Sequence, residues 1–272
     1  MSDMAGSSSQ KSRADSYLLA DSDFAVERAR LRALELAYDP ATIARLNLLG
    51  VRPGMRCLEI GAGCGSIASW LANRVGAEGH VVATDIDPRF LTDLADGVEV
   101  VRHDITSDPL EPGSFDLIHV RIVLMHVPDA AAVVERIVDA LAPGGYLLAE
   151  EADFSVGQDP GVSRLAELDR KFMDGAIRAG RSLGADWTLG ARVAEMLQSS
   201  GLEGVAGDGS CRFQRCGPER TDLVSIEELG PAAIASGAIT SAELAELAEL
   251  LENSDAFRMT PLIVGAWGRT PD

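Results

Sequence analysis

The stretch CLEIGAGCGS, residues 57–66, is the part of the sequence that decides the fold. Its apolar first half predicts a short buried strand over 56–61, and a helix is predicted over 66–75. Between them, glycine stands at three alternate positions, Gly61, Gly63 and Gly65. Glycine allows a tight turn and the close approach of a ligand, and the helix N-terminus offers unpaired N–H groups. The stretch therefore predicts a strand, a ligand-binding loop and a helix in succession.

Strands and helices continue to alternate after this unit. Strands are predicted at 80–85, 98–103, 114–120 and 146–150, and helices at 88–95 and 130–141. Such alternation implies an α/β fold with a parallel sheet and right-handed crossovers. Helical spacing also covers 21–47, with a break near Asp39-Pro40. Beyond residue 151 the helices are predicted at 162–181, 190–200, 220–229 and 240–253, and the strands at about 210–216 and 262–267.

The chain organisation follows from this pattern. We expect a disordered leader over 1–14, an N-terminal helical cap over 15–50, and one domain over 51–272. Two helical insertions, at about 155–200 and 218–258, interrupt that domain. The regular alternation is confined to its first part.

Charge and composition limit the classes of partner that the protein can bind. Of 272 residues, 46% are hydrophobic, and 42 acidic residues against 24 basic ones give a net charge of −18. Such a surface repels phosphate backbones and anionic lipids, so we expect no nucleic acid and no membrane as partner. No apolar stretch approaches the ~20 residues of a membrane span, and no segment of signal-peptide type begins the sequence. We expect a cytoplasmic protein with a small or neutral partner.

The cysteines add no metal site to this expectation. Cys57, Cys64, Cys211 and Cys216 lack the tight pairing of zinc ligands, and no carboxylate set typical of a metal-dependent site is visible. We therefore expect reduced thiols and no metal.

Acidic residues follow the second and third predicted strands. Asp85 lies 20 residues after Gly65, a spacing at which a carboxylate can accept both hydroxyls of a ribose. Asp104 can accept from an adenine amino group, with Ile86 and Ile105 on either face of the ring. The pattern predicts a nucleoside across the strand ends, although each acid could instead be a cap or turn residue.

The glycine spacing indicates which nucleoside ligand fits. A dinucleotide needs G-x-G-x-x-G so that its pyrophosphate sits on the helix N-terminus. Here the pattern is G-x-G-x-G, and Glu59 stands two residues before the first glycine. A carboxylate there suits a ligand with an ammonium and a sulfonium group rather than phosphates.

The same residues resemble the class I S-adenosylmethionine-dependent methyltransferases. Four of that family's motifs have counterparts in order, in residues 57–65, 81–87, 115–128 and 141–147. The resemblance covers about 50–152. It implies a Rossmann-like, seven-stranded, mostly parallel sheet with helices on both faces and an antiparallel last strand, the two late strands being the sixth and seventh.

The resemblance also implies a cofactor site for S-adenosyl-L-methionine, with S-adenosyl-L-homocysteine as product. Its counterparts here are Glu59, Gly61, Ala62, Gly63, Gly65, Asp85, Ile86, Asp104, Ile105 and Val120. The N-terminal segment resembles that of small actinobacterial-type natural-product methyltransferases, in Tyr17-Leu18-Leu19 and in Glu27-Arg28-Ala29-Arg30-Leu31. In these, front helices fold over the cofactor, and Tyr17 is a candidate contact to its methionine end.

Residues for catalysis and acceptor binding are less specific. His119, His126 and Glu151 are candidate bases, because a base assists transfer to a hydroxyl or an activated carbon. His119 could instead point into the core, His126 could be structural, and Glu151 could lie in a solvated loop after the fifth strand. Arg121, Phe172 and Trp187 are candidate substrate contacts. Arg121 could instead bind a carboxylate of the fold, and the two aromatic residues could simply pack in the core.

The expected function is methyl transfer to a small-molecule acceptor, an intermediate of secondary-metabolite or antibiotic biosynthesis, at an O, N or C atom. Protein methylation remains open, as does a cofactor-binding protein without transfer that acts as a cyclase or regulatory module, because fold does not fix reaction. A nicotinamide oxidoreductase is disfavoured by the glycine spacing. A homodimer remains open.

Overall fold

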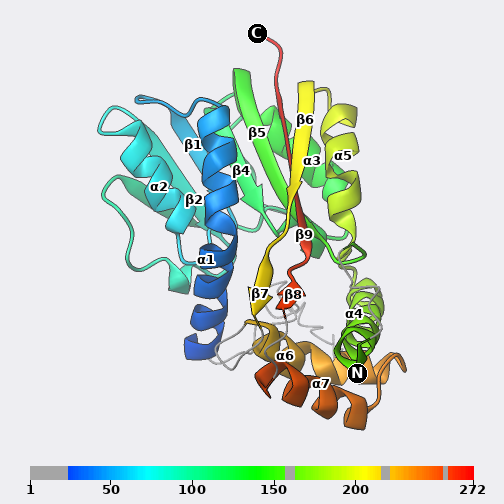
Figure 1. The fold of residues 1–272 in the computed structure, drawn as a ribbon. Coiled ribbons are helices and arrows are strands. Elements are labelled where there is room, and N and C mark those ends of the chain that lie inside the picture. Colours follow the sequence, from blue (N-terminus) through cyan, green and yellow to red (C-terminus); the bar gives the residue numbers. More distant parts are fainter. Residues whose placement is uncertain (1–23, 157–162, 216–220, 254–256) are drawn as a thin grey trace, which may run out of the picture.

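The computed structural model describes residues 24–156, 163–215, 221–253 and 257–272 (Figure 1). The expected leader over 1–14, together with Tyr17 and Cys216, lies outside these residues. Within the described part, no helix combines the length and the apolar character needed to cross a membrane.

A seven-stranded sheet forms the centre of the molecule, in the order β3-β2-β1-β4-β5-β9-β6. Six of its strands run parallel, and the last one, β9, is antiparallel to both neighbours, β5 and β6. The predicted fold class is therefore confirmed. The strand bounds are β1 Arg56–Ile60, β2 His80–Asp85, β3 Val98–Arg102, β4 Phe115–Arg121, β5 Leu141–Asp153, β6 Glu203–Ser210 and β9 Leu262–Arg269.

Helices cover both faces of this sheet, because its central strands are buried on both sides. Helices α1 (Phe24–Leu48) and α2 (Ser66–Val75) pack on one face through Leu46, Leu71 and Leu117. Helices α3 (Ala130–Asp139) and α5 (Val193–Ser199) pack on the other, against alternate strand residues such as Ile118 and Val120. One strand residue therefore faces α1 and the next faces α3.

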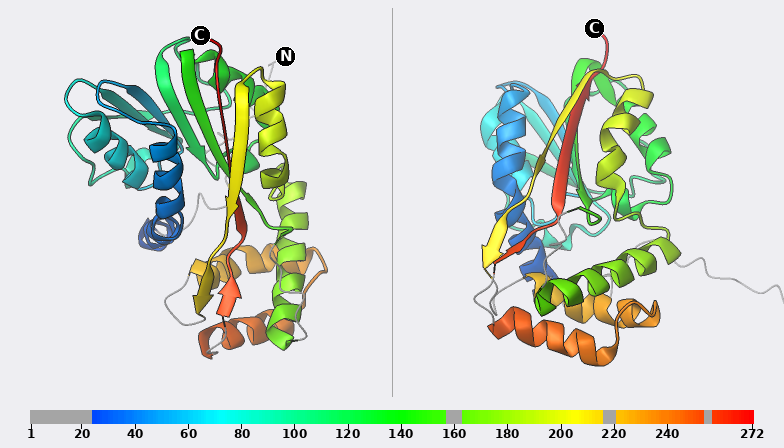
Figure 2. Two further views of the ribbon diagram at one scale, coloured as in Figure 1. Left: turned by 45° about the horizontal axis from the view of Figure 1, so that its top comes forward. Right: turned by 45° about the vertical axis from the view of Figure 1, so that its right-hand side comes forward.

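A separate helical layer lies beyond the carboxyl ends of the parallel strands (Figures 1 and 2). It comprises α4 (Arg164–Ser182), α6 (Thr221–Ala235) and α7 (Ser241–Asn253), which share an apolar cluster around Leu168, Phe172 and Leu247. Next to it, β7 (Phe213–Arg215) and β8 (Phe257–Met259) form a small antiparallel sheet.

Three sequence-based predictions are wrong in this structure. Helix α1 continues through Pro40, because ion pairs and hydrogen bonds to the sheet hold it on both sides of the proline. Residues 88–95 contain only the short 3-10 helix η2 (Pro88–Phe90), since Leu91 and Leu94 turn inward to pack against the glycine loop. The sixth strand of the sheet is β6 at Glu203–Ser210, not the predicted segment at about 210–216. Its sequence EGVAGDGS has low strand propensity, because it contains three glycines and two acidic residues.

Candidate active site

The glycine loop joins β1 to α2 at the carboxyl edge of the sheet. Gly61, Gly63 and Gly65 all have positive φ, of 69°, 59° and 85°. A Cβ at Gly61 would come closer than 3.0 Å to Val123, and one at Gly65 would do the same to Leu94. Conformation and close approach thus both require glycine at these two positions.

Asp85 fastens the loop to the end of β2. Its Oδ2 accepts the Gly63 N–H at 3.0 Å, and its Oδ1 accepts the Asp87 N–H at 2.9 Å. Burial raises the pKa of the Asp85 carboxyl, although these N–H donors act in the opposite direction. The carboxylate therefore faces the loop from the neighbouring strand.

A cavity of about 820 Å³ opens where β1, β2, β3 and β4 end. Its volume lies within the roughly 300–1,000 Å³ typical of small-ligand pockets. Eight of the predicted cofactor residues line it, namely Glu59, Gly61, Ala62, Gly63, Asp85, Ile86, Asp104 and Ile105. Gly65 and Val120 do not: Gly65 packs against Leu94, and Val120 is fully buried on the α3 face.

Asp104 reaches this cavity from the turn after β3. Its Oδ1 accepts the N–H of Thr106 at 2.9 Å and the hydroxyl of Thr106 at 2.6 Å. The turn interpretation and the ligand interpretation of this residue are therefore compatible, because the carboxylate both caps the turn and lines the cavity.

Helix α1 forms the opposite wall, which the sequence analysis did not assign to the site residue by residue. Glu27, Arg30, Leu31, Leu34 and Glu35 line the cavity from this helix. The Glu27 and Arg30 side chains pair at 2.6 Å, and Glu35 accepts the N–H of Ser66 at 3.0 Å, at the start of α2. The spacing 27, 31, 34/35 on one helix face is the signal that could have found them.

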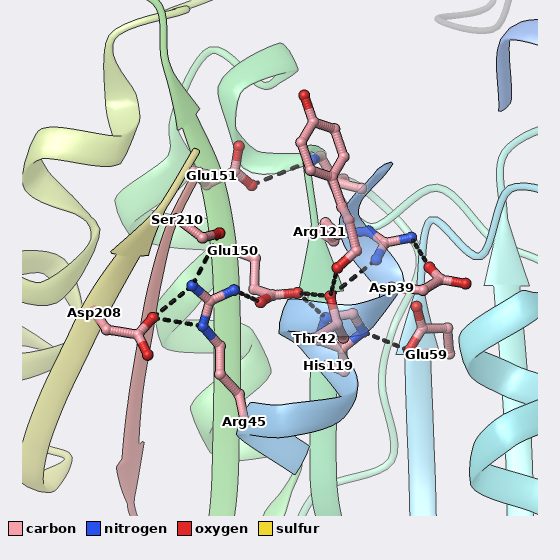
Figure 3. A network of polar contacts seen from close by, with 12 residues as sticks. Asp39, Thr42, Arg45, Glu59, His119, Arg121, Glu150, Glu151, Asp208 and Ser210 are labelled. Atoms are coloured by element: carbon pink, nitrogen blue, oxygen red, sulfur yellow. Dashed lines mark hydrogen bonds and ion pairs between the residues drawn. The ribbon is translucent and has the colours of Figure 1, made fainter. Parts of the chain in front are cut away.

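A buried network of charges lies between α1 and the sheet (Figure 3). His119 is fully buried, with Nδ1 2.7 Å from Oε2 of Glu59 and Nε2 3.0 Å from Oε2 of Glu150. Burial alone would lower the pKa of His119, but the two carboxylates raise it to about 9. Burial alone would raise the pKa of Glu150, but His119, Arg45 and Thr42 lower it to about 2.

Side chains of α1 complete the network. Thr42 and Arg45 both donate to Glu150, and Arg45 also donates to Asp208 of β6 at 2.7 Å. Arg121 lines the cavity, donates to the Thr42 hydroxyl at 2.9 Å and pairs with Asp39 at 2.9 Å.

The segment after β4 carries His126. Ile122 has a φ of 54°, unusual for a β-branched residue. The buried carboxylate of Glu151 accepts the N–H groups of Val123, Leu124 and Met125 at 2.8–3.2 Å, at the start of η3 (Leu124–His126). Burial raises the pKa of Glu151 to about 8, although these N–H donors act to lower it.

His126 lines the cavity, unlike the two other candidate bases. Burial, together with the positive charge of Arg30, lowers the pKa of His126 to about 4, so its imidazole is neutral at neutral pH. His119 and Glu151 do not line the cavity. Strand alternation turns His119 toward α1, and the backbone of η3 surrounds the carboxylate of Glu151.

The two aromatic candidates do not line the cavity. Phe172 packs between α4, α6 and α7, and Trp187 packs against Phe154 with ring centroids 5.7 Å apart. Among the residues that line a second hollow of about 610 Å³, between α3 and α5, Val127 and Pro128 are shared with the first. In the described part of the chain, no group of three or more His, Cys, Asp or Glu side chains could hold a metal ion.

Comparison with known protein families supports one interpretation of this site. A family model described as a methyltransferase domain matches residues 58–149, from β1 into β5. Methyltransferase str2 of Strobilurus tenacellus is 34% identical over 145 residues, 51% of this chain and 52% of the relative. The chain thus spans about half the length of that relative.

A longer match is the ubiquinone biosynthesis O-methyltransferase of Xylella fastidiosa, 32% identical over 181 residues, 63% of this chain and 71% of the relative. Among solved structures, the phosphoethanolamine N-methyltransferase 2 of Haemonchus contortus in complex with S-adenosyl-L-methionine has a TM-score of 0.56 at 18% identity, covering 94% of this chain and 59% of that one. A methyltransferase structure from Bacillus halodurans has a TM-score of 0.55 at 17% identity, covering 85% and 100%. These structural likenesses support the fold.

Proposed function

Because the chain belongs to the class I S-adenosylmethionine-dependent methyltransferases, we propose that it transfers the methyl group of S-adenosylmethionine to a small-molecule acceptor. The observation that carries the proposal is the cavity itself, in which the glycine loop and the carboxylates of Asp85 and Asp104 meet at successive strand ends. We further propose that the acceptor belongs to secondary metabolism. The resemblance of residues 27–31 to natural-product methyltransferases supports this class of acceptor.

The residues at the floor of the cavity fit such a cofactor. A Cβ at Gly63 would meet no atom closer than a Leu31 carbon at 3.7 Å, so the loop backbone faces the cavity without overlap. Asp85 would accept the ribose hydroxyls, Asp104 would accept from the adenine amino group, and Ile86 and Ile105 would pack on the ring. Glu59 would face the cationic methionine end.

The acceptor would occupy the part of the cavity between α1 and η3. Leu31, Leu34 and Leu183 make this part apolar, while Arg30, Arg121 and His126 supply polar groups. An apolar wall with a few placed polar groups is typical of small-molecule sites. This composition favours a small organic acceptor over an extended macromolecular one.

S-adenosylmethionine supplies an electrophilic methyl carbon when bound. The chain's own residues then need to exclude water and to align the attacking atom. Helix α1 covers the cavity, and Val123, held beside Gly61 by the turn at Ile122, narrows it. We propose that neutral His126 accepts a hydrogen bond from the attacking atom. Its low pKa suits an acceptor of a hydrogen bond rather than a strong base.

The cellular setting belongs to the same proposal. The free thiols of Cys57, Cys64 and Cys211, together with the net charge of −18, support a reducing, cytoplasmic setting.

Calorimetry and a turnover assay test the proposal together. We expect S-adenosylmethionine and S-adenosylhomocysteine to bind with one-to-one stoichiometry and NAD not to bind. We also expect release of S-adenosylhomocysteine with phenols, amines or activated carbon acids from a panel. Binding of NAD without binding of either adenosyl ligand would contradict the proposal. Adenosyl-ligand binding without turnover on any panel member or on peptides would favour a cofactor-binding protein.

A further inference from the structure

The buried charges around His119 have a geometry that defines the state of the imidazole. Both ring nitrogens lie within hydrogen-bond distance of a carboxylate oxygen, at 2.7 Å and 3.0 Å. A neutral imidazole donates from one nitrogen only, whereas an imidazolium donates from both. The arrangement therefore fits a cation between two anions, in agreement with the raised pKa of His119.

Both strands next to His119 and the helix above it contribute a charge to this cluster, and β6 adds one through Arg45. Glu59 comes from β1, Glu150 from β5, Arg45 from α1 and Asp208 from β6. Arg121 and Asp39 join through Thr42. With His119 protonated, three cations, namely His119, Arg45 and Arg121, face the three carboxylates of Glu59, Glu150 and Asp39, while the side chain of Asp208 is 56% exposed.

Stability alone is a poor explanation for such a cluster. Removing charges from water has a desolvation cost that their mutual attraction often fails to offset, and apolar replacements are frequently no less stable. Here His119 and Glu150 are 0% exposed and Glu59 is 4% exposed. The cluster is better explained by what it positions.

Glu59 stands two residues before the glycine loop, and it is the carboxylate of the cluster that lines the cavity, as the cation Arg121 also does. Its Oε2 accepts a hydrogen bond from His119, and within the described residues its Oε1 has no polar partner. Strand register supports this orientation, because Glu59 and His119 are direct neighbours across β1 and β4. One carboxylate oxygen is thus left for a cation in the cavity.

We propose that His119 is a positioning residue that holds Glu59 in place, with one carboxylate oxygen turned toward the cationic end of the cofactor. The inference rests on the proposed function and assigns a role to a residue that touches neither cofactor nor acceptor. Through Glu150, which accepts from Thr42 and Arg45, the same imidazolium also fixes the helix that walls the cavity.

A double-mutant cycle on cofactor affinity tests this role. Glu59→Gln, His119→Gln and the double variant are compared by calorimetry with S-adenosylmethionine. We expect each single variant to raise the dissociation constant about tenfold and the double variant to raise it no further, because His119 acts through Glu59. A merely structural His119 would give independent effects, hence about a hundredfold increase in the double variant, and that result would overturn the inference.

Two measures keep the test decisive. His80→Gln is the matched control, because it removes a histidine–glutamate pair of 2.9 Å that is exposed on the same sheet, and it should leave the dissociation constant unchanged. Should His119→Gln not fold by circular dichroism, Glu150→Gln replaces it, since it weakens the imidazolium from the other side. The same non-additivity with Glu59→Gln is expected, and additive effects would again overturn the inference.

The outcome also separates this inference from the function on which it rests. A folded wild-type protein that binds neither adenosyl ligand would overturn the proposed function and this inference with it. A wild-type protein that binds both ligands, with additive variants or with an unaffected His119→Gln, would overturn only the role of His119.

Discussion

Replacing Gly61 by alanine should damage the protein in two separable ways. The φ of 69° places an alanine in the left-handed region, which has a cost of about 1–2 kcal/mol. The new methyl group would also lie closer than 3.0 Å to Val123, and overpacking of this kind costs about 1–3 kcal/mol. Together we expect Gly61→Ala to lower the free energy of unfolding by about 2–5 kcal/mol.

Gly50→Ala is the matched control. Gly50 has a similar φ of 76°, but nothing lies within 4 Å of a Cβ built there. It should show the conformational cost of about 1–2 kcal/mol without the overlap. Urea unfolding of the wild type and both variants gives the two values, and their difference isolates the contact with Val123.

Val123→Ala in the Gly61→Ala background should recover the overlap part, because it removes the atom that the new methyl group meets. The same overlap moves a side chain that lines the cavity, so Gly61→Ala should also weaken S-adenosylmethionine binding, whereas Gly50→Ala should not. Equal destabilisation by Gly61→Ala and Gly50→Ala, or no recovery with Val123→Ala, would refute the reasoning.

Three further predictions concern single side chains. Asp85→Ala should weaken cofactor binding by about 1–3 kcal/mol in calorimetry, because a charged hydrogen bond is lost. Asp139→Asn, at the exposed end of α3, is the control and should have no effect. Equal cofactor affinities of the wild type and Asp85→Ala would count against the ribose role. His126→Phe should lower kcat about 100-fold with cofactor affinity unchanged, as measured by S-adenosylhomocysteine release; a loss of affinity instead would move His126 to the cofactor. The raised pKa of His119, about 9 against an ordinary 6.5, implies a stabilising contribution that is fully present below pH 6.5 and lost as pH rises through 9. Urea unfolding between pH 6 and about 9.5 should therefore show a steeper decline for the wild type than for His119→Gln, and parallel profiles would contradict the imidazolium.

The sequence predicts best where local chemistry and tertiary structure agree. Helix α2 and strand β2 have the expected bounds, 66–75 and 80–85, because apolar periodicity and turn residues delimit both. The glycine loop and the strand-end acids meet because the carboxyl ends of parallel strands lie at one edge of a sheet. Pattern alone is sufficient for this part of the site.

Prediction fails where distant residues decide. Strand β6 forms because β9 offers a partner to a glycine-rich segment, and α1 passes through Pro40 because β4 and β5 supply polar partners beside it. The surroundings of His119 depend on five chain segments. Neither its protonation nor its distance from the cavity can therefore be deduced from the residues next to it in the sequence. Register between β1 and β4 is the missing information.

The link from Arg45 to Asp208 has a consequence for the order in which the protein folds. The two residues are separated by 163 positions, and they fasten the first helix to the edge strand of the sheet. When residues up to η3 have left the ribosome, nearly all residues that line the cavity are present. Glu150 of β5 and Asp208 of β6, which both bind Arg45 of α1, are not yet synthesised. Contacts at such separation form late and slowly. We therefore expect helix α1 to dock fully on the sheet only after the later strands have been added.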